Sequence, residues 1–149
     1  MKTIFNEADK NEILARIEKL TPESKALWGK MSVSQMLAHC TEAAKLASGE
    51  IKTTFAPIQI MGSLFKNSFI HQGKPFRKNS PTSPDLKMVE PKEFEKEKAD
   101  FIASVNKTFQ EGEKGVKSNR HPFFGKMNVA EWGLWGYKHL DHHLSQFGV

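Results

Sequence analysis

The sequence predicts an all-α protein, a four-helix bundle with a long crossover connection between its second and third helices. Three observations support this prediction. Four long stretches repeat apolar residues every three or four positions, helix-cap patterns precede two of them, and no stretch alternates apolar and polar residues as a strand does. The 149 residues match the usual size of one domain, so we expect a single helical domain over residues 1–149.

The first two helices are expected in the N-terminal third of the chain. Residues 7–20 repeat apolar side chains at helical spacing. Ser32 followed by Gln35 is a capping-box pattern, so the second helix should cover residues 33–48 and end at Gly49. Because this helix is apolar on most sides, we expect it to be buried.

The pattern is interrupted by prolines and glycines over residues 51–90. We expect a short helix near Ile58–Phe69 and extended chain after it, since so long a connection is seldom plain coil in a compact domain. Pro91 should occupy the first turn of the third long helix, which ends at the Gly112–Gly115 break.

The C-terminal part predicts a turn over His121–Gly125, followed by the last helix. That helix should start at Asn128, whose side chain forms a second cap pair with Glu131. It carries a mixed stripe of aromatic and polar side chains: Trp132, Trp135, His139, His143 and Gln146.

Composition and charge exclude several classes of protein. A net charge of +5 would permit a nucleic-acid partner, but the basic residues mostly alternate with acidic ones and no nucleic-acid-binding motif occurs, so we predict none. No run approaches the roughly 20 apolar residues of a membrane span, so we predict no membrane partner. The single cysteine, Cys40, is expected to be a small buried residue, and an N-terminus that lacks a secretory signal predicts a cytoplasmic protein.

Four of the six histidines fall on the second and last helices. At about 100° per residue, His139 and His143 lie roughly 40° apart around the helix and one turn apart along it, so both imidazoles can converge on one point. His39 should also point into the bundle. Three neutral imidazoles with a fourth position left open form the ligand set of a catalytic zinc-type site.

Other interpretations of these histidines remain open. An inward-facing histidine is often a hydrogen-bonded core residue, and this HxxxH pair lacks the glutamate that a zincin helix carries. His142 could replace His143, although His143 projects closer to His139, and we assign His142 to the rim of the site. His71 and His121 lie beside glycine or proline in loops and are expected at the surface.

The segment Met36–Glu42 and the ending His139–Gln146, of the type H-x-x-H-H-x-x-Q, resemble the DinB-like/YfiT-like metalloenzyme superfamily. The order of predicted elements is also similar, since that family is a four-helix bundle with a long crossover. The resemblance implies that His39, His139 and His143 bind a divalent metal ion such as zinc, nickel or iron. Leu144 and Ser145 stand where Arg-Gly often precedes the glutamine, which indicates a branch without an assigned activity.

Members of that superfamily include enzymes that use low-molecular-weight thiols. The resemblance therefore implies a metal-dependent enzyme that activates a thiol or water for transfer to, or hydrolysis of, a small molecule. Four basic residues of the connection could bind the carboxylates of such a thiol: Lys66, Lys74, Arg77 and Lys78. They are equally well explained as solvated surface charges. Glu42 could orient a ligand imidazole, act as a base or form a surface ion pair. The alternative is a non-catalytic dimeric interaction module whose histidines are polar core residues.

Two further expectations concern assembly and access. The superfamily often forms dimers, and the aromatic-rich segment 55–76 exceeds what one bundle is expected to cover, so we predict a homodimer. The open metal position should face the connection 55–85, because Asp141 projects away from His139 and Glu42 would have to lean back across a helical turn.

Overall fold

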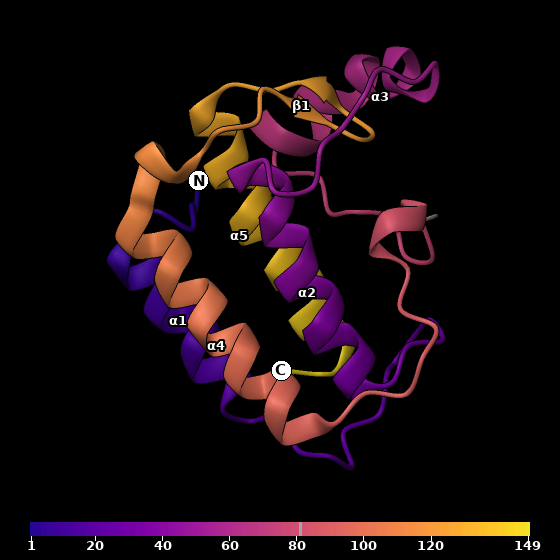
Figure 1. Cartoon of the computed structure of the whole chain (residues 1–149), viewed down its shortest axis with the longest axis vertical. Coiled ribbons are helices and arrows are strands. Elements are labelled where there is room, and N and C mark those ends of the chain that lie inside the picture. The colour runs from indigo at the N-terminus through magenta and orange to yellow at the C-terminus, as the bar shows by residue number, and fades with distance from the viewer. Residues whose placement is uncertain (81) are drawn as a thin grey trace.

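The computed structural model describes residues 1–80 and 82–149 (Figure 1). Pro81, which belongs to the predicted connection, lies outside the described residues. The described chain is mostly helical, with five α-helices and one short hairpin. In chain order the elements are α1 (Glu7–Ile17), α2 (Val33–Ser48), α3 (Ile58–Lys66), the π-helical turn η1 (Asn67–His71), the 3-10 turn η2 (Pro84–Leu86), α4 (Phe94–Glu111), the 3-10 turn η3 (Gly112–Gly115), β1 (Arg120–His121), β2 (Gly125–Lys126) and α5 (Val129–Gln146).

The four long helices pack on one another around the main core. Helix α1 contacts α4 and α5, and α2 contacts the same two helices. Figure 1 shows α1 and α4 along one side of the molecule and α2 in front of α5. The predicted helical class is therefore confirmed, while the four-helix bundle topology with its long crossover remains a prediction. None of the described helices has the length and hydrophobicity needed to cross a membrane.

The predicted helix caps are present and fix the two helices that carry the histidines. At α2, Gln35 N donates to Ser32 Oγ at 3.1 Å, and the Gln35 side chain accepts from Ser32 N. Gly49 ends α2 in the left-handed region with φ 77°, as glycine does without steric cost. Asn128 and Glu131 form the same reciprocal pair at the start of α5.

Two helix ends differ from the prediction. Helix α1 ends at Ile17 and not at residue 20, because Lys19 and Leu20 N–H groups bond three residues back in a tightened final turn. Helix α4 begins at Phe94 and not at Pro91. The Glu93 side chain accepts from two backbone N–H groups of the first turn, which makes Glu93 the cap.

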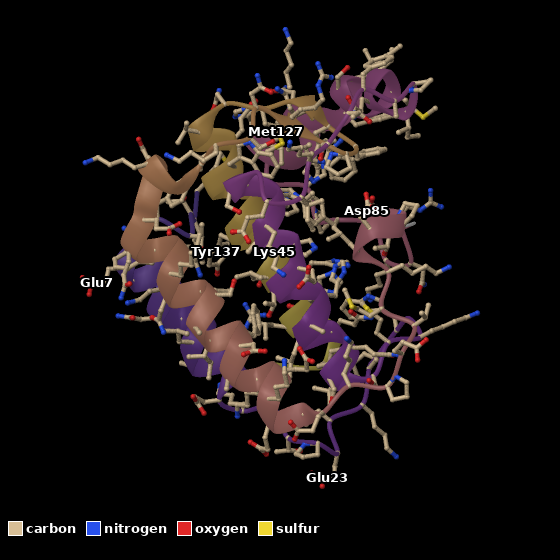
Figure 2. The ribbon with its side chains drawn as sticks, in the orientation of Figure 1. Glu7, Glu23, Lys45, Asp85, Met127 and Tyr137 are labelled. Atoms are coloured by element: carbon tan, nitrogen blue, oxygen red, sulfur yellow. The ribbon has the colours of Figure 1, made fainter. Side chains whose placement is uncertain are left out.

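The connection between α2 and α4 is folded and partly helical, as expected. Helix α3 and η1 occupy its first half, and η2 lies beside α2, near the Asp85 label in Figure 2. The β1–β2 hairpin was not expected, because two residues per strand give no alternating pattern. The hairpin, η1 and the N-terminal part of α5 share a second apolar core that includes Trp132, Trp135 and Phe124.

Candidate metal centre

Three histidines from two helices converge at the middle of the structure. One ring nitrogen each of His39, His139 and His143 lies within 4.8 Å of the other two. His39 belongs to α2 and the other two belong to α5, so residues 100 positions apart in the chain meet here. His39 and His143 are buried, and His139 is partly buried. The helical spacing that predicted this cluster is therefore matched by the structure.

A backbone contact fixes the protonation of His39. Its Nδ1 lies 2.9 Å from the carbonyl oxygen of Leu86, which can only accept a hydrogen bond. Nδ1 must therefore carry the proton, and the neutral ring presents the lone pair of Nε2. That Nε2 lies 3.2 Å from Nε2 of His139. A hydrogen-bonded Nδ1 with an unprotonated Nε2 is the usual arrangement of a metal-binding histidine.

The side chain of Gln146 fixes the protonation of His143. The Gln146 Nε2 donates to the carbonyl oxygen of Trp28 at 2.7 Å, which fixes the orientation of the amide. The Oε1 of that amide then faces His143 Nδ1 at 2.9 Å and accepts a hydrogen bond from the Nδ1–H group. His143 is thus also held as the neutral ring with a free Nε2.

His139 is positioned by aromatic packing. Its ring stacks on Trp135 with centroids 4.8 Å apart and an angle of 24° between the planes. Burial holds the pKa of His139 well below its ordinary value, and the neighbouring histidines lower it further. Burial also lowers the pKa of His39, and it lowers the pKa of His143 to about 3. All three imidazoles are therefore neutral near pH 7, as metal binding requires.

The spacing of one pair of these nitrogens fits a shared metal ion. With bonds of 2.0–2.1 Å, a tetrahedral zinc-type ion places two nitrogen ligands about 3.3 Å apart. The 3.2 Å between His39 Nε2 and His139 Nε2 is close to that value. A shared cation would satisfy the converging lone pairs, and an all-imidazole set suits zinc, nickel and iron alike.

The carboxylates considered as a fourth ligand are engaged elsewhere. Asp141 forms an ion pair with Arg16 at 2.6 Å, which confirms that it projects away from the cluster. Glu42 forms an ion pair with Lys45 at 2.5 Å on the surface of α2. Among the described residues, the possible metal-binding group has three members and not four. A four-coordinate ion held by these three rings would therefore have one ligand position left for water or a small molecule.

A cleft between α2, α4 and α5 includes His139 in its wall. The cleft holds about 70 Å³ and is mainly apolar, with Cys40, Ala43 and Trp132 among its other walls. Its lining contains His139 but neither of the other two histidines, and no described residue of the connection 55–85. The expectation that the open metal position faces that connection therefore remains a prediction. Phe69 and Phe76, which belong to that connection, pack their aromatic side chains against the second core.

The remaining histidines have separate roles. His142 lies at the rim, as expected, with its ring 5.8 Å from Trp28 and 6.0 Å from Phe76. His71 is exposed, as expected, and contacts Glu131.

The prediction that His121 lies at the surface is wrong. His121 is 8% exposed, and its Nδ1 accepts hydrogen bonds from the N–H groups of Phe123 and Phe124. These bonds close the hairpin turn and direct the ring onto Trp135 in the second core. Cys40 is buried, as expected, and burial raises the pKa of its thiol.

Sequence reasoning did not assign the groups that orient the ligands. Gln146 was visible three residues after His143, a spacing that brings side chains together on a helix. Leu86 and Trp28 act through their carbonyl oxygens, and no side-chain pattern reveals such a role.

Residues 4–148 match the model of a family described as a protein of unknown function, DUF1569, and the chain belongs to that family. No curated protein and no solved structure matches the chain.

Proposed function

We propose that this member of the DUF1569 family is a metal-dependent enzyme with the four-helix bundle and long crossover of the DinB-like superfamily. Its metal ligands are His39, His139 and His143. The observation that supports this proposal is the convergence of three neutral imidazoles, two of them held in the metal-binding tautomer by hydrogen bonds.

The proposed reaction transfers a low-molecular-weight thiol, or a water-derived hydroxyl, to a small-molecule substrate. A bound divalent ion supplies Lewis acidity, which lowers the pKa of a thiol or water at the open position. The protein orients the imidazoles through Leu86 and Gln146. The stacked ring of Trp135 and the apolar walls of the cleft limit the access of bulk water.

The basic loop residues differ in whether they are available to bind a carboxylate of an anionic thiol. Lys66 is engaged with Glu131 and with the carbonyl oxygen of Lys126. Lys78 lies over the Trp28 ring at 4.3 Å, and Trp28 borders His142 at the rim of the site. Lys78 is therefore the residue we propose to hold a carboxylate of the substrate.

Metal content tests the proposal. Protein reconstituted separately with zinc, nickel, iron and manganese should retain about one ion per chain for at least one of these metals, measured by mass spectrometry of the elements after gel filtration. His39→Ala, His139→Ala and His143→Ala should each lose it. His71→Ala is the matched control, since His71 lies outside the cluster, and it should retain the metal. Wild-type protein that retains none of the four metals would overturn the proposal and favour a non-catalytic interaction module.

A spectroscopic experiment tests the open position. Cobalt-loaded protein should gain a near-ultraviolet thiolate-to-metal band when 2-mercaptoethanol is added, because a thiolate would occupy the fourth position. If 2-mercaptoethanol does not change the spectrum of protein that holds cobalt, the metal site would be structural and not catalytic.

A further inference from the structure

A second cleft lies between α2, the chain from η2 to residue 92, and the first half of α4. It holds about 440 Å³, which is within the range of small-molecule sites, and none of the three clustered histidines lines it. Lys45 and Asp85, which belong to its walls on α2 and η2, are labelled in Figure 2. Charged side chains make up most of the lining, so the cleft suits a charged ligand.

Glu97 occupies a position of α4 where an apolar side chain is expected. It lies three residues after Phe94 and four before Phe101, so all three are on the same side of the helix. Phe94 and Phe101 pack in the main core, and Glu97 is only 8% exposed. A carboxylate at such a position needs a partner that offsets its lost hydration.

The part of the chain that the structure describes does not supply a hydrogen bond to the Glu97 carboxylate. Its only ion-pair partner there is Lys96, whose Nζ lies 3.9 Å from Oε1, beyond hydrogen-bonding distance. The same Nζ donates to Asp100 at 2.6 Å. The Glu97 carboxylate lines the cleft, and it can therefore accept hydrogen bonds from a ligand there.

The wall that α2 contributes fits a donor group. Ala38 and Thr41, which have short side chains, line the cleft on this helix. The Thr41 hydroxyl donates to the carbonyl oxygen of Leu37 at 3.0 Å, so its oxygen is left to accept from a ligand. A carboxylate and an accepting hydroxyl together favour a ligand group that is positively charged and donates several hydrogen bonds, as a primary ammonium group does.

A metal ion fits this cleft less well. Hard cations need several oxygen ligands at one point. Within the described residues, the histidine cluster is the only group of three or more side chains close enough to hold an ion. Two other carboxylates of the cleft are also engaged, because Glu42 pairs with Lys45 and Asp100 pairs with Lys96. A single ammonium group on Glu97 requires no such convergence.

Two exposed charges of the lining are left for the far end of a ligand. Asp85 and Lys92 line the cleft, and neither has an ion-pair partner in residues 1–80 or 82–149. Asp85 could bind a second ammonium group, and Lys92 could bind a carboxylate. Met88 and Ala38 provide apolar surface for a methylene chain.

We infer that this cleft binds a small alkylammonium ion, whose charged group pairs with Glu97 and whose methylene chain packs against Ala38 and Met88. The net charge of the whole protein is +5, so attraction of a cation is a local property of the cleft. The inference goes beyond the proposed function and does not depend on it, because no proposed metal ligand lines the cleft.

Isothermal titration calorimetry of the full chain tests the inference with n-butylamine and with butyrate, which has the same length and the opposite charge. Butylamine should bind and butyrate should not. Glu97→Gln keeps the size of the side chain and removes its charge, so it should weaken butylamine binding by about 10–100-fold. Glu95→Gln is the matched control, since Glu95 is exposed on the same turn of α4 and does not line the cleft, and it should bind as wild type does.

Thr41→Val provides a second test, because it keeps the charge of Glu97 and removes the accepting hydroxyl. It should weaken butylamine binding several-fold. Two further probes identify the far end of the ligand: tighter binding of 1,4-diaminobutane than of butylamine would support a diamine held by Asp85, and tighter binding of 4-aminobutyrate would support an amino acid held by Lys92. Butylamine that does not bind, or that binds Glu97→Gln with the wild-type affinity, would overturn the inference.

Discussion

Gln146 shows how one residue can determine the chemistry of another. Its amide bridges the carbonyl oxygen of Trp28 and the ring of His143, so the loop before α2 sets the tautomer of a ligand on α5. Gly29 is required beside this bridge for two reasons. Its φ is +82°, and a Cβ there would lie 2.5 Å from Gln146 Nε2.

Gln146→Leu should weaken metal binding by about 10–100-fold, the usual effect of losing a partner that orients a ligand. The leucine offers no acceptor to His143 Nδ1. Gln146→Glu is the comparison, because a carboxylate still accepts from Nδ1 but no longer donates to Trp28, and its loss should be smaller. Competition with a chromophoric chelator measures both affinities. Equal affinity of wild type and Gln146→Leu would show that the bridge does not position the ligand.

At the scale of elements, local signals were sufficient for the helices and insufficient for the segments between them. The cap pairs at Ser32 and Asn128 are short-range patterns, and both helices begin where those patterns indicate. Burial of loop residues depends on long-range packing, which a sequence window does not contain. The sequence therefore predicts His121 at the surface, because Pro122 follows it in a turn, although the hairpin folds its ring into the second core.

The buried His121 predicts acid sensitivity of the hairpin. Burial lowers the pKa of this ring to about 3, whereas the unfolded chain has the ordinary value near 6.5. The unfolded state therefore binds more protons below pH 6.5, and the stability that the neutral ring contributes falls as the pH drops from 6.5 towards 3. At pH 5 the expected loss is about 2 kcal/mol.

His121→Asn tests this contribution. Asparagine can accept from the N–H groups two and three residues on, as His121 does, but it does not titrate. Urea unfolding of metal-free protein at pH 7.5 and pH 5 should show a smaller acid-induced loss in His121→Asn than in wild type. The measurement at pH 7.5 separates the lost ring packing from the pH effect. An identical acid-induced loss in both proteins would contradict the assignment.

At the scale of the whole molecule, the candidate site depends on how distant segments are brought together. Helical spacing could predict that His139 and His143 converge, because both lie on one element. That His39 meets them could be expected only from the resemblance and from its inward-facing side, since it lies 100 residues away from His139. The Leu86 carbonyl and the direction of the cleft could not be predicted, because they depend on the path of the long connection and on the packing of α4.

A metal bound by α2 and α5 should stabilise the whole fold, because the unfolded chain does not hold these histidines together. At a free metal concentration of 100 times Kd, the expected gain is about 2.7 kcal/mol. For a domain of this size that gain raises Tm by roughly 5–11 °C. Thermal unfolding, followed by circular dichroism with and without a chelator, should show the difference in wild type. It should be absent in His143→Ala, which keeps His39 and His139 but loses the third ligand. A chelator that leaves the wild-type Tm unchanged, in protein shown to have contained the ion, would mean that the metal does not join the two helices.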